Sequence, residues 1–424
     1  MSLLMEHMIG LTDTAYLGRV GEVELGASAL AGVYYLVIYM LGFGFSIGAQ
    51  VLIARRNGAQ EYKRIGPVFL QGTFFLLLLA ALLFTASHLY SPFFLRKLIG
   101  SDDVYQATMK YVDWRVYGFF FSFVAVMFRA FYVGITKTKI LTVNSVVMVL
   151  TNVMLNYVLI FGKFGLPALG IAGAAMATAM GQIIGGTIPL VYFLRKNSSS
   201  LRLRRPKWDG GALRRACTNG VSELMSSISM SIVGMLYNAQ LMRYAGENGV
   251  AAYGTIMYVD FIFLAIFIGY ATGVASVISY HYGAGNKKEL NNLLKRSVLL
   301  IAAASLSMLL LSEVMAAPLA AIFVGYDAGL LDMTVHAYSI YAVSFLFCGF
   351  SIFSSAFFTA LGDGLTSALI AFLRTLVFES ASVIILPLLL GLNGIWGAII
   401  VAECMSVTVS VIFLVAKRRR YQYF

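Results

Sequence analysis

Charged side chains are scarce in this sequence of 424 residues. Asp, Glu, Lys and Arg together make up 12% of the chain, whereas 60% of it is hydrophobic. An ordinary soluble domain carries roughly 25% charged residues. So few charges cannot cover a folded surface in water, which excludes an ordinary soluble protein and indicates an all-α protein embedded in lipid.

Cysteines and enzyme motifs are also scarce. The three cysteines, Cys217, Cys348 and Cys404, lie in or beside apolar runs without CxxC spacing. This spacing excludes a disulfide framework and a cysteine-based metal site. The sequence has no GxxxxGK[ST] phosphate loop and no HExxH motif, so we expect neither ATP hydrolysis by this chain nor another enzyme activity. No cofactor is expected beyond a coupling ion.

The formal net charge of +12 is confined to short stretches between the apolar runs. Basic clusters between apolar runs are typical of cytoplasmic loops, and this placement argues against nucleic acid as a partner. All of them fall on one side of the membrane if the chain crosses it twelve times, so both termini are predicted to be cytoplasmic. The clusters are Arg55–Arg64, Lys137–Lys139, Arg195–Arg215, Lys287–Arg296 and Lys417–Arg420.

Twelve apolar runs are long enough to cross the membrane as helices, since a crossing takes about 20 residues. The predicted transmembrane helices lie near 1–19, 26–54, 65–90, 108–136, 139–162, 169–194, 213–243, 250–281, 292–323, 332–361, 365–390 and 394–417.

The polar stretch near the middle of the chain divides it into two similar halves. We predict a six-helix lobe over residues 1–197, a cytoplasmic linker over 198–212 and a second six-helix lobe over 213–424. Laying residue n on residue n+225 aligns Gly44 with Gly269 and Gly48 with Gly273, and a shift of 224 aligns Gly173 with Gly397. An even number of helices in each half gives the two repeats the same membrane orientation, as in transporters with parallel repeats.

One acidic residue lies inside the first predicted helix. A charge at the bilayer centre costs about 2.5–3.5 kcal/mol on insertion scales, so Asp13 is a functional candidate. Asn152 and Asn156 lie one turn apart on the fifth helix, and Thr178 lies on the sixth. We predict that these four residues surround a protonated carboxyl group or a Na⁺ ion. Ordinary hydrogen bonding between helices is the alternative for the two asparagines.

The second half carries more polar residues at membrane depth. Glu223, Ser227, Ser231 and Asn238 recur on one face of the seventh helix, a pattern typical of a helix facing a cavity. The carboxylates Asp260, Glu379 and Glu403 lie on the eighth, eleventh and twelfth helices. We predict that all seven line a substrate cavity, with a structural hydrogen bond as the alternative for each of the last three. Arg129 and Arg374 are interpreted as anchors at cytoplasmic helix ends.

Several motifs along the chain resemble those of one transporter family. Asp13-Thr14 with Leu17-Gly18-Arg19-x-Gly21, and Asn152-x-x-x-Asn156 followed by Gly170-Ile171-Ala172-Gly173-Ala174-Ala175-x-Ala177-Thr178, resemble the first, fifth and sixth helices of the multidrug and toxic compound extrusion (MATE) family. Tyr282-Gly283-Ala284-Gly285-Asn286 resembles the loop after its eighth helix. The resemblance extends over essentially the whole chain.

The resemblance implies twelve helices in two pseudo-symmetric lobes around a V-shaped cavity. It also implies an antiporter in a bacterial cytoplasmic (inner) membrane that works as a monomer and exports cationic or amphipathic drugs in exchange for H⁺ or Na⁺. Asp13 matches the family's ion-binding carboxylate, and Asn152 and Thr178 match its supporting ligands. The chain departs from the family at Asn156, where Asp is usual, and at Ser351, where the Na⁺-coupled subclass has a carboxylate. Family first helices are longer, so the first helix here is expected to be truncated.

Two other functions remain compatible with the sequence. A flippase for lipid-linked oligosaccharides has the same helical plan, but its cavity needs several Arg residues to bind pyrophosphate, and carboxylates prevail here. A degenerate membrane protein without transport activity is the other alternative, favoured by the short first helix.

Overall fold

Helices make up nearly all of the described part of the chain. The computed structural model describes residues 2–99, 101–136, 138–194, 208–325 and 327–423. It divides into two compact units, Met1–Cys217 and Thr218–Phe424, called the first and second lobe below. Most of the predicted linker 198–212 lies outside the described residues.

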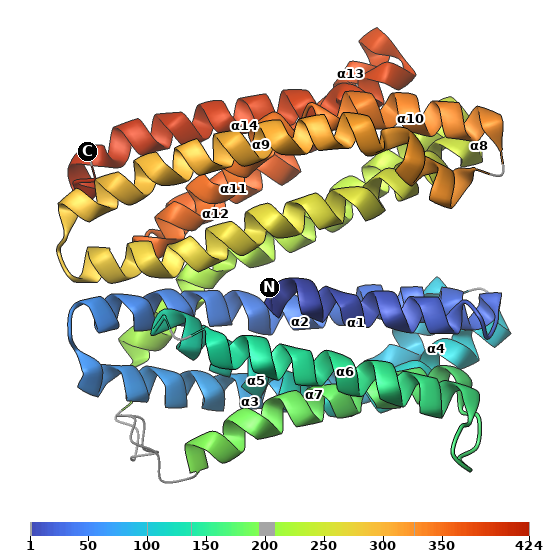
Figure 1. The fold of residues 1–424 in the computed structure, drawn as a ribbon, viewed down its shortest axis with the longest axis horizontal. Helices are drawn as coiled ribbons and strands as arrows, with labels where there is room; N and C mark the ends of the chain where they lie inside the picture. The colour runs from blue at the N-terminus through green and yellow to red at the C-terminus, as the bar shows by residue number, and fades with distance from the viewer. Residues whose placement is uncertain (1, 100, 137, 195–207, 326, 424) are drawn as a thin grey trace. The chain divides into compact units, whose positions relative to one another are not determined.

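The first lobe contains the helices up to α7 and the beginning of α8 (Figure 1). Ala212 and Ala216, at the beginning of α8, belong to its hydrophobic core. The elements are α1 (Ser2–Leu17), α2 (Glu22–Gly58), α3 (Tyr62–Leu98), α4 (Asp102–Arg115), η1 (Val116–Gly118), α5 (Phe119–Gly134), α6 (Lys139–Phe161) and α7 (Gly170–Leu194).

The second lobe contains the rest of α8 (Gly210–Gly283) and all later helices. Gly246 interrupts α8 with φ 63° and ψ −152°, a backbone conformation that glycine adopts most readily. The later elements are α9 (Lys287–Val324), α10 (Ala328–Ala342), α11 (Phe345–Ala360), α12 (Gly364–Phe372), the π-helix η2 (Leu373–Glu379), α13 (Ser380–Leu390) and α14 (Leu392–Tyr421).

The predicted membrane crossings all fall on these helices. Among the described residues, nine helices are long and apolar enough to cross a membrane, or ten if α10 and α11, bent by 49°, form one crossing. The difference from twelve has two sources. The break at Gly246 divides the 74 residues of α8 into two lengths of crossing size, and α1 has 16 residues, fewer than a full crossing takes.

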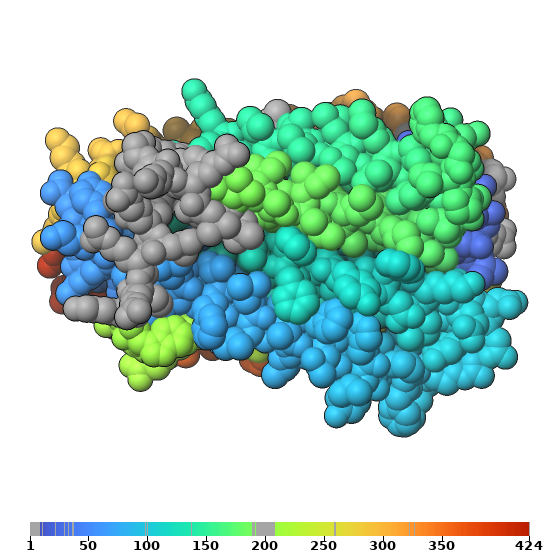
Figure 2. Space-filling model, turned by 90° about the horizontal axis from the view of Figure 1, so that it is seen from below, coloured from blue at the N-terminus to red at the C-terminus, as the bar shows by residue number. Residues whose placement is uncertain are grey.

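Large apolar side chains are exposed along α3, a helix that is drawn in blue in the space-filling view of Figure 2. Phe74, Leu78, Leu82 and Leu89 are all exposed on this helix. Exposed apolar side chains along a helix of crossing length indicate a surface in contact with lipid.

The two lobes repeat the same pairs of packed helices. In the first lobe α5 packs on α3 and α7, and α6 packs on α7. In the second lobe α11 packs on α9 and α14, and α13 packs on α14. These pairs correspond under the internal repeat, in which α7 and α14 share the aligned glycine motif, so the packing supports the duplicated architecture that the sequence predicts.

The aligned glycines Gly173 and Gly397 differ in their surroundings, which yields a matched prediction. A methyl group at position 173 would lie 2.7 Å from the backbone carbonyl of Leu159, so α6 and α7 approach closely there. The nearest atom to a methyl group at position 397 lies 4.0 Å away, on Ile340. We expect Gly173→Ala to lower the free energy of unfolding by about 1–3 kcal/mol and Gly397→Ala to leave it unchanged. Thermal unfolding in detergent measures both, and equal unfolding temperatures would contradict the close packing.

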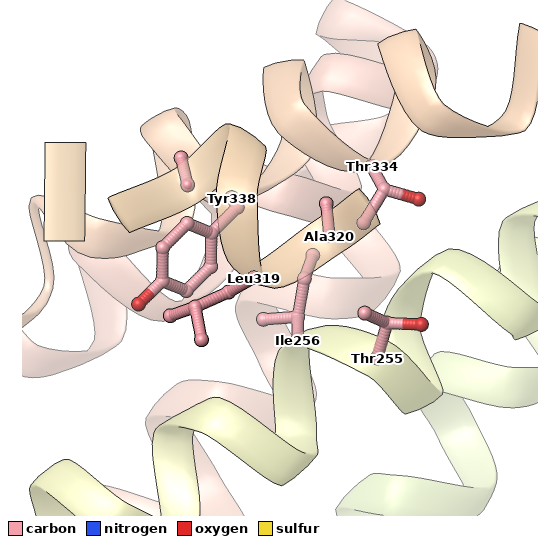
Figure 3. Close-up of a pocket in the computed structure, with 7 residues that line it drawn as sticks. Thr255, Ile256, Leu319, Ala320, Thr334 and Tyr338 are labelled. Atoms are coloured by element: carbon pink, nitrogen blue, oxygen red, sulfur yellow. The ribbon is translucent and has the colours of Figure 1, made fainter. Parts of the chain in front are cut away.

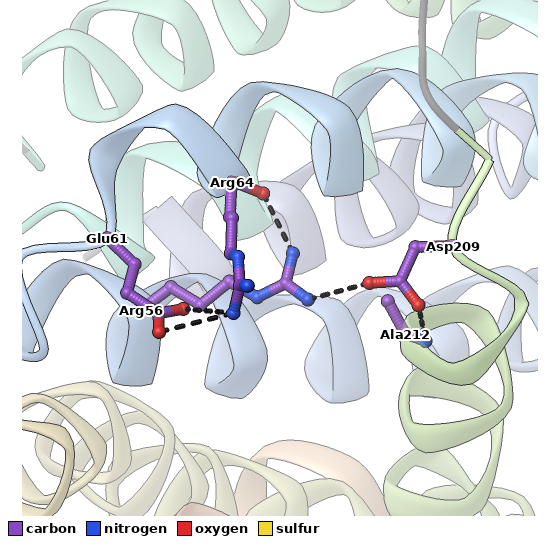
Figure 4. A network of polar contacts seen from close by, with 5 residues as sticks. All are labelled: Arg56, Glu61, Arg64, Asp209 and Ala212. Atoms are coloured by element: carbon purple, nitrogen blue, oxygen red, sulfur yellow. Dashed lines mark hydrogen bonds and ion pairs between the residues drawn. The ribbon is translucent and has the colours of Figure 1, made fainter.

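An ion pair fixes the beginning of α8 to the end of α2 (Figure 4). Arg56 Nη2 lies 3.0 Å from Asp209 Oδ2, and Asp209 Oδ1 accepts from the backbone N–H of Ala212 at 3.0 Å. The hydrogen bonds from Ala212 and Arg56 hold the pKa of Asp209 below its usual value. The other guanidinium nitrogen of Arg56 donates to the Arg64 carbonyl at 2.8 Å, so one arginine joins three chain segments.

A second polar junction joins the end of α14 to the beginning of α12. Asp363 Oδ2 accepts from Lys417 Nζ at 2.7 Å and from the Tyr421 hydroxyl at 2.8 Å, while Oδ1 caps the Thr366 N–H. Burial alone would raise the pKa of Asp363, but the bonds from Lys417, Tyr421 and Thr366 outweigh it and lower the pKa. Asp363 therefore stays ionised at neutral pH.

Candidate functional site

Asp13 lies in the last turn and a half of α1, where that helix packs against α6 and α7. Its side chain is 6% exposed, and those of Asn152, Asn156 and Thr178 are at most 2% exposed. α7 can approach α6 because its residues there are small, with Ala174, Ala175 and Ala177 completely buried. The close approach brings polar groups from three helices to one point.

The four predicted residues form one hydrogen-bonded group. Asn156 Nδ2 donates to Asp13 Oδ1 at 2.6 Å, and Asn152 Nδ2 lies 3.2 Å from the same oxygen. The Thr178 hydroxyl donates to Asp13 Oδ2 at 2.6 Å. Asn152 and Asn156 are also bonded to each other at 3.0 Å, as expected for residues one helical turn apart. Both carboxylate oxygens of Asp13 therefore accept from neutral donors.

Two residues that lie near Asp13 were not predicted from the sequence. Tyr111 and Arg115, both on α4, lie close enough to interact electrostatically with the Asp13 carboxylate. The Arg115 guanidinium lies over the ring of Tyr35, 5.1 Å from its centroid. Arg115 Nη1 is buried and has no hydrogen-bond partner among the described residues. Tyr111 and Arg115 lie four residues apart in the apolar stretch Asp102–Gly134, which is long enough to cross a membrane, and this spacing was the available signal.

The predicted stripe on α8 is only partly buried. Glu223 and Ser227 are half-buried, whereas Ser231 and Asn238 are exposed. The Ser227 hydroxyl donates to the Glu223 carbonyl at 2.9 Å, and the Ser231 hydroxyl donates to the Ser227 carbonyl at 3.2 Å. The two serines thus bond back along their own helix, and the stripe remains accessible within the second lobe.

The other three carboxylates gather inside the second lobe with an arginine. Arg374 Nη2 and Nε lie 2.6 and 2.7 Å from Glu403 Oε1. The interpretation of Arg374 as an anchor at a helix end is therefore wrong, because its guanidinium pairs inside the lobe with a side chain that is 2% exposed. Arg129 is also buried, at 9% exposure, rather than extended toward a surface. Asp260 and Glu379 interact electrostatically with Arg374 and Glu403.

A small pocket between α8, α9 and α10 carries no comparable chemistry (Figure 3). Thr255, Ile256, Leu319, Ala320, Thr334 and Tyr338 line it, together with Ala316. The hydroxyls of Thr255 and Thr334 donate to backbone carbonyls of their own helices, at 3.1 and 2.7 Å. Its lining therefore offers a ligand mainly apolar contacts.

Comparison with known proteins decides the family. The MatE family model matches residues 1–158 and 224–382, which is one stretch in each lobe and well over half of the chain. The chain belongs to the MATE family. This is a family of transporters and not of enzymes, in agreement with the sequence analysis.

Distant bacterial relatives of this MATE chain are described as multidrug exporters. The probable multidrug resistance protein NorM of Idiomarina loihiensis is 25% identical over 298 residues, which cover 67% of this chain and 62% of NorM. The chain thus spans about three-fifths of that relative. The multidrug export protein MepA of Staphylococcus saprophyticus is 24% identical over 429 residues, covering 98% of this chain and 91% of MepA.

Solved structures of the family share the fold. A MATE crystal structure in a bent conformation superposes with a TM-score of 0.91 at 20% sequence identity, covering 99% of this chain and 92% of the other. This likeness confirms the predicted all-helical membrane fold.

Proposed function

We propose that this chain exports small organic cations in exchange for protons and that Asp13 binds the coupling proton. One observation carries the proposal: a carboxylate that is 6% exposed and accepts hydrogen bonds from three neutral side chains on α6 and α7. Burial disfavours the charged form of a carboxylate, so binding either a proton or a cation is favourable at this position.

The donors around Asp13 favour a proton over Na⁺. Hard cations are held by several oxygen ligands, whereas Asn152 and Asn156 present N–H groups to the carboxylate. Sodium coupling is the alternative, and the experiment below tests for it with a Na⁺ gradient.

Asn156 can serve both protonation states of Asp13. Its Nδ2 donates to the carboxylate, while its Oδ1 is buried without a partner in the described residues. Rotation of the amide by half a turn would present Oδ1 to the hydroxyl of a protonated Asp13, since an amide both donates and accepts. An Asp at this position could not donate when ionised, which gives Asn156 a role suited to a proton site.

The transport cycle follows from competition at Asp13. An ionised Asp13 attracts a cationic cargo, and protonation from the outer side removes that attraction and releases the cargo. The protonated carboxyl group can then return to the inward state without a buried negative charge. One pH unit supplies about 1.4 kcal/mol, a tenfold cargo gradient for each proton exchanged.

The stripe of Glu223, Ser227, Ser231 and Asn238 is proposed to line the path of the cargo. Its exposed and half-buried side chains offer one carboxylate and several hydroxyl and amide groups to an amphipathic cation. We place the protein as a monomer in a bacterial cytoplasmic membrane with both termini cytoplasmic. The basic residues Arg418, Arg419 and Arg420 in the last turn of α14 support that orientation.

Reconstitution into proteoliposomes tests this function. Vesicles containing the protein are loaded with ethidium, a monovalent organic cation, and are given either a pH gradient or a Na⁺ gradient. We expect the pH gradient to drive ethidium movement and the Na⁺ gradient at uniform pH to have no effect. Ethidium movement driven only by the Na⁺ gradient would make Na⁺, rather than H⁺, the coupling ion. No ethidium movement under either gradient would overturn the proposed function.

A further inference from the structure

Positive charge gathers at one end of the first lobe, where the end of α2, the beginning of α3 and the beginning of α8 meet. The bonds of Arg56 to Asp209 and to the Arg64 carbonyl hold these three segments together (Figure 4). Six basic and two acidic side chains lie on the three segments, which leaves four positive charges. This basic surface consists of Arg55, Arg56, Lys63, Arg64, Arg214 and Arg215, with Glu61 and Asp209 as the acidic residues.

Most of these charges are accessible to a partner. The exposed basic side chains are Arg55, Lys63, Arg64, Arg214 and Arg215. Arg56 pairs with Asp209 at 3.0 Å, and Arg215 lies close enough to interact electrostatically with the same carboxylate. The ion pair between Arg64 and Glu61, at 3.3 Å, is exposed on both sides and therefore weak. An anionic partner can thus compete for the Arg64 guanidinium.

Aromatic side chains place the basic surface at the boundary between lipid and water. Trp208, two residues before α8, is 66% exposed, and its ring packs on Phe74 of α3 with 5.9 Å between centroids. Phe74 lies in the row of exposed apolar side chains along α3, which indicates contact with lipid. Tyr62, at the beginning of α3, is exposed as well. Trp and Tyr are enriched where a membrane protein passes from lipid into water.

The combination of charges and exposed rings identifies the partner. A soluble acidic partner would satisfy the charges but would leave the rings of Trp208 and Phe74 without an apolar counterpart. An anionic phospholipid offers both, because its phosphate carries the negative charge and its acyl chains extend along α3. Clusters of four to eight basic residues beside a transmembrane helix are typical of surfaces that bind anionic lipids.

We propose that the basic surface binds the head groups of anionic phospholipids, with the Trp208 ring among the upper parts of their acyl chains, and so fixes the beginning of α8 to the membrane surface. The proposal does not depend on the cargo or on the coupling ion. Each basic side chain near an anionic surface strengthens binding about fivefold. Salt weakens the attraction, because the screening length falls from about 10 Å at 0.1 M to about 3 Å at 1 M.

Quenching of Trp208 fluorescence by lipids with brominated acyl chains tests the proposal. The chain contains three tryptophans, so the difference between the wild type and Trp208→Phe isolates the signal of Trp208. The full chain is reconstituted in phosphatidylcholine with the same small fraction of brominated phosphatidylglycerol or brominated phosphatidylcholine. We expect phosphatidylglycerol to be preferred around Trp208 at least tenfold at low salt, and the preference to be mostly lost at 1 M salt.

Two double variants with the same change of charge locate the effect. Arg214→Gln with Arg215→Gln removes two charges of the basic surface and should lower the preference at least fivefold. Lys287→Gln with Lys288→Gln is the matched control, because both lysines are exposed at the beginning of α9 in the second lobe. It should leave the preference at Trp208 unchanged. Lys63→Gln, on α3, gives a milder second test with a loss of about fivefold expected.

Three outcomes would overturn the proposal. Equal quenching by the two brominated lipids in the wild type would show that charge does not select the lipid. No quenching of Trp208 by either lipid would place this residue outside the bilayer. Equal losses of preference in the two double variants would assign the attraction to the net charge of the whole protein rather than to the basic surface.

Discussion

Asp13→Asn is expected to reduce ethidium transport driven by a pH gradient to the level of protein-free vesicles. The amide oxygen can still accept from Asn156 and the amide NH₂ can donate to the Thr178 hydroxyl, each partner lying 2.6 Å from a carboxylate oxygen in the wild type, so the helices should remain packed. An amide neither gains nor loses a proton near neutral pH, and it carries no charge for a cationic cargo. Transport should therefore stop while expression and thermal stability stay close to wild type.

The control for this variant is an acidic residue that lies outside the site. Asp332 on α10 is exposed, so Asp332→Asn should transport at the wild-type rate. A drug-susceptibility assay in an efflux-deficient bacterium gives the same comparison in cells. Wild-type transport rates from Asp13→Asn would refute the coupling role of Asp13.

Glu403→Gln is expected to have the largest effect on stability. The substitution leaves the Arg374 guanidinium without its ionised partner, 2.6 Å away, in the interior of the second lobe. Removing one partner of a buried ion pair costs about 3–5 kcal/mol, because the remaining charge is uncompensated. Thermal unfolding in detergent should show a large decrease in unfolding temperature.

A double variant separates the loss of pairing from a general packing defect. Arg374→Met combined with Glu403→Gln removes both charges and should recover much of the lost stability. The exposed pair Glu61 and Arg64 provides the control, and Glu61→Gln should change stability by less than about 1 kcal/mol. If the double variant is less stable than Glu403→Gln alone, the loss of stability in Glu403→Gln cannot be attributed to the unpaired charge of Arg374.

The first-lobe site could be predicted because its residues follow simple rules. An acidic residue in an apolar helix stands out, and Asn152 and Asn156 share a face at a spacing of four. The family resemblance then brings Asp13 together with the fifth and sixth helices. The hydrogen bonds among these residues match that grouping, whereas their transport role remains a proposal.

The second-lobe cluster could not be predicted in this form. On a regular α-helix, Arg374 and Glu379 point in different directions, so their spacing predicted neither a common cluster nor the pair with Glu403. The π-helix changes that geometry, and no residue pattern in Leu373–Glu379 announces it. Similarly, Tyr111 and Arg115 approach Asp13 only through tertiary packing of α4.

The pH dependence of ethidium binding to the purified protein tests the central claim most directly. If protons and cargo compete at Asp13, the wild-type affinity should weaken as the pH falls, by up to tenfold per pH unit once Asp13 is mostly protonated. Asp13→Asn should bind ethidium more weakly, and the pH dependence of its affinity should correspond to the release of one proton fewer on binding. A wild-type affinity that does not change with pH, or an identical curve for both proteins, would contradict competition at Asp13.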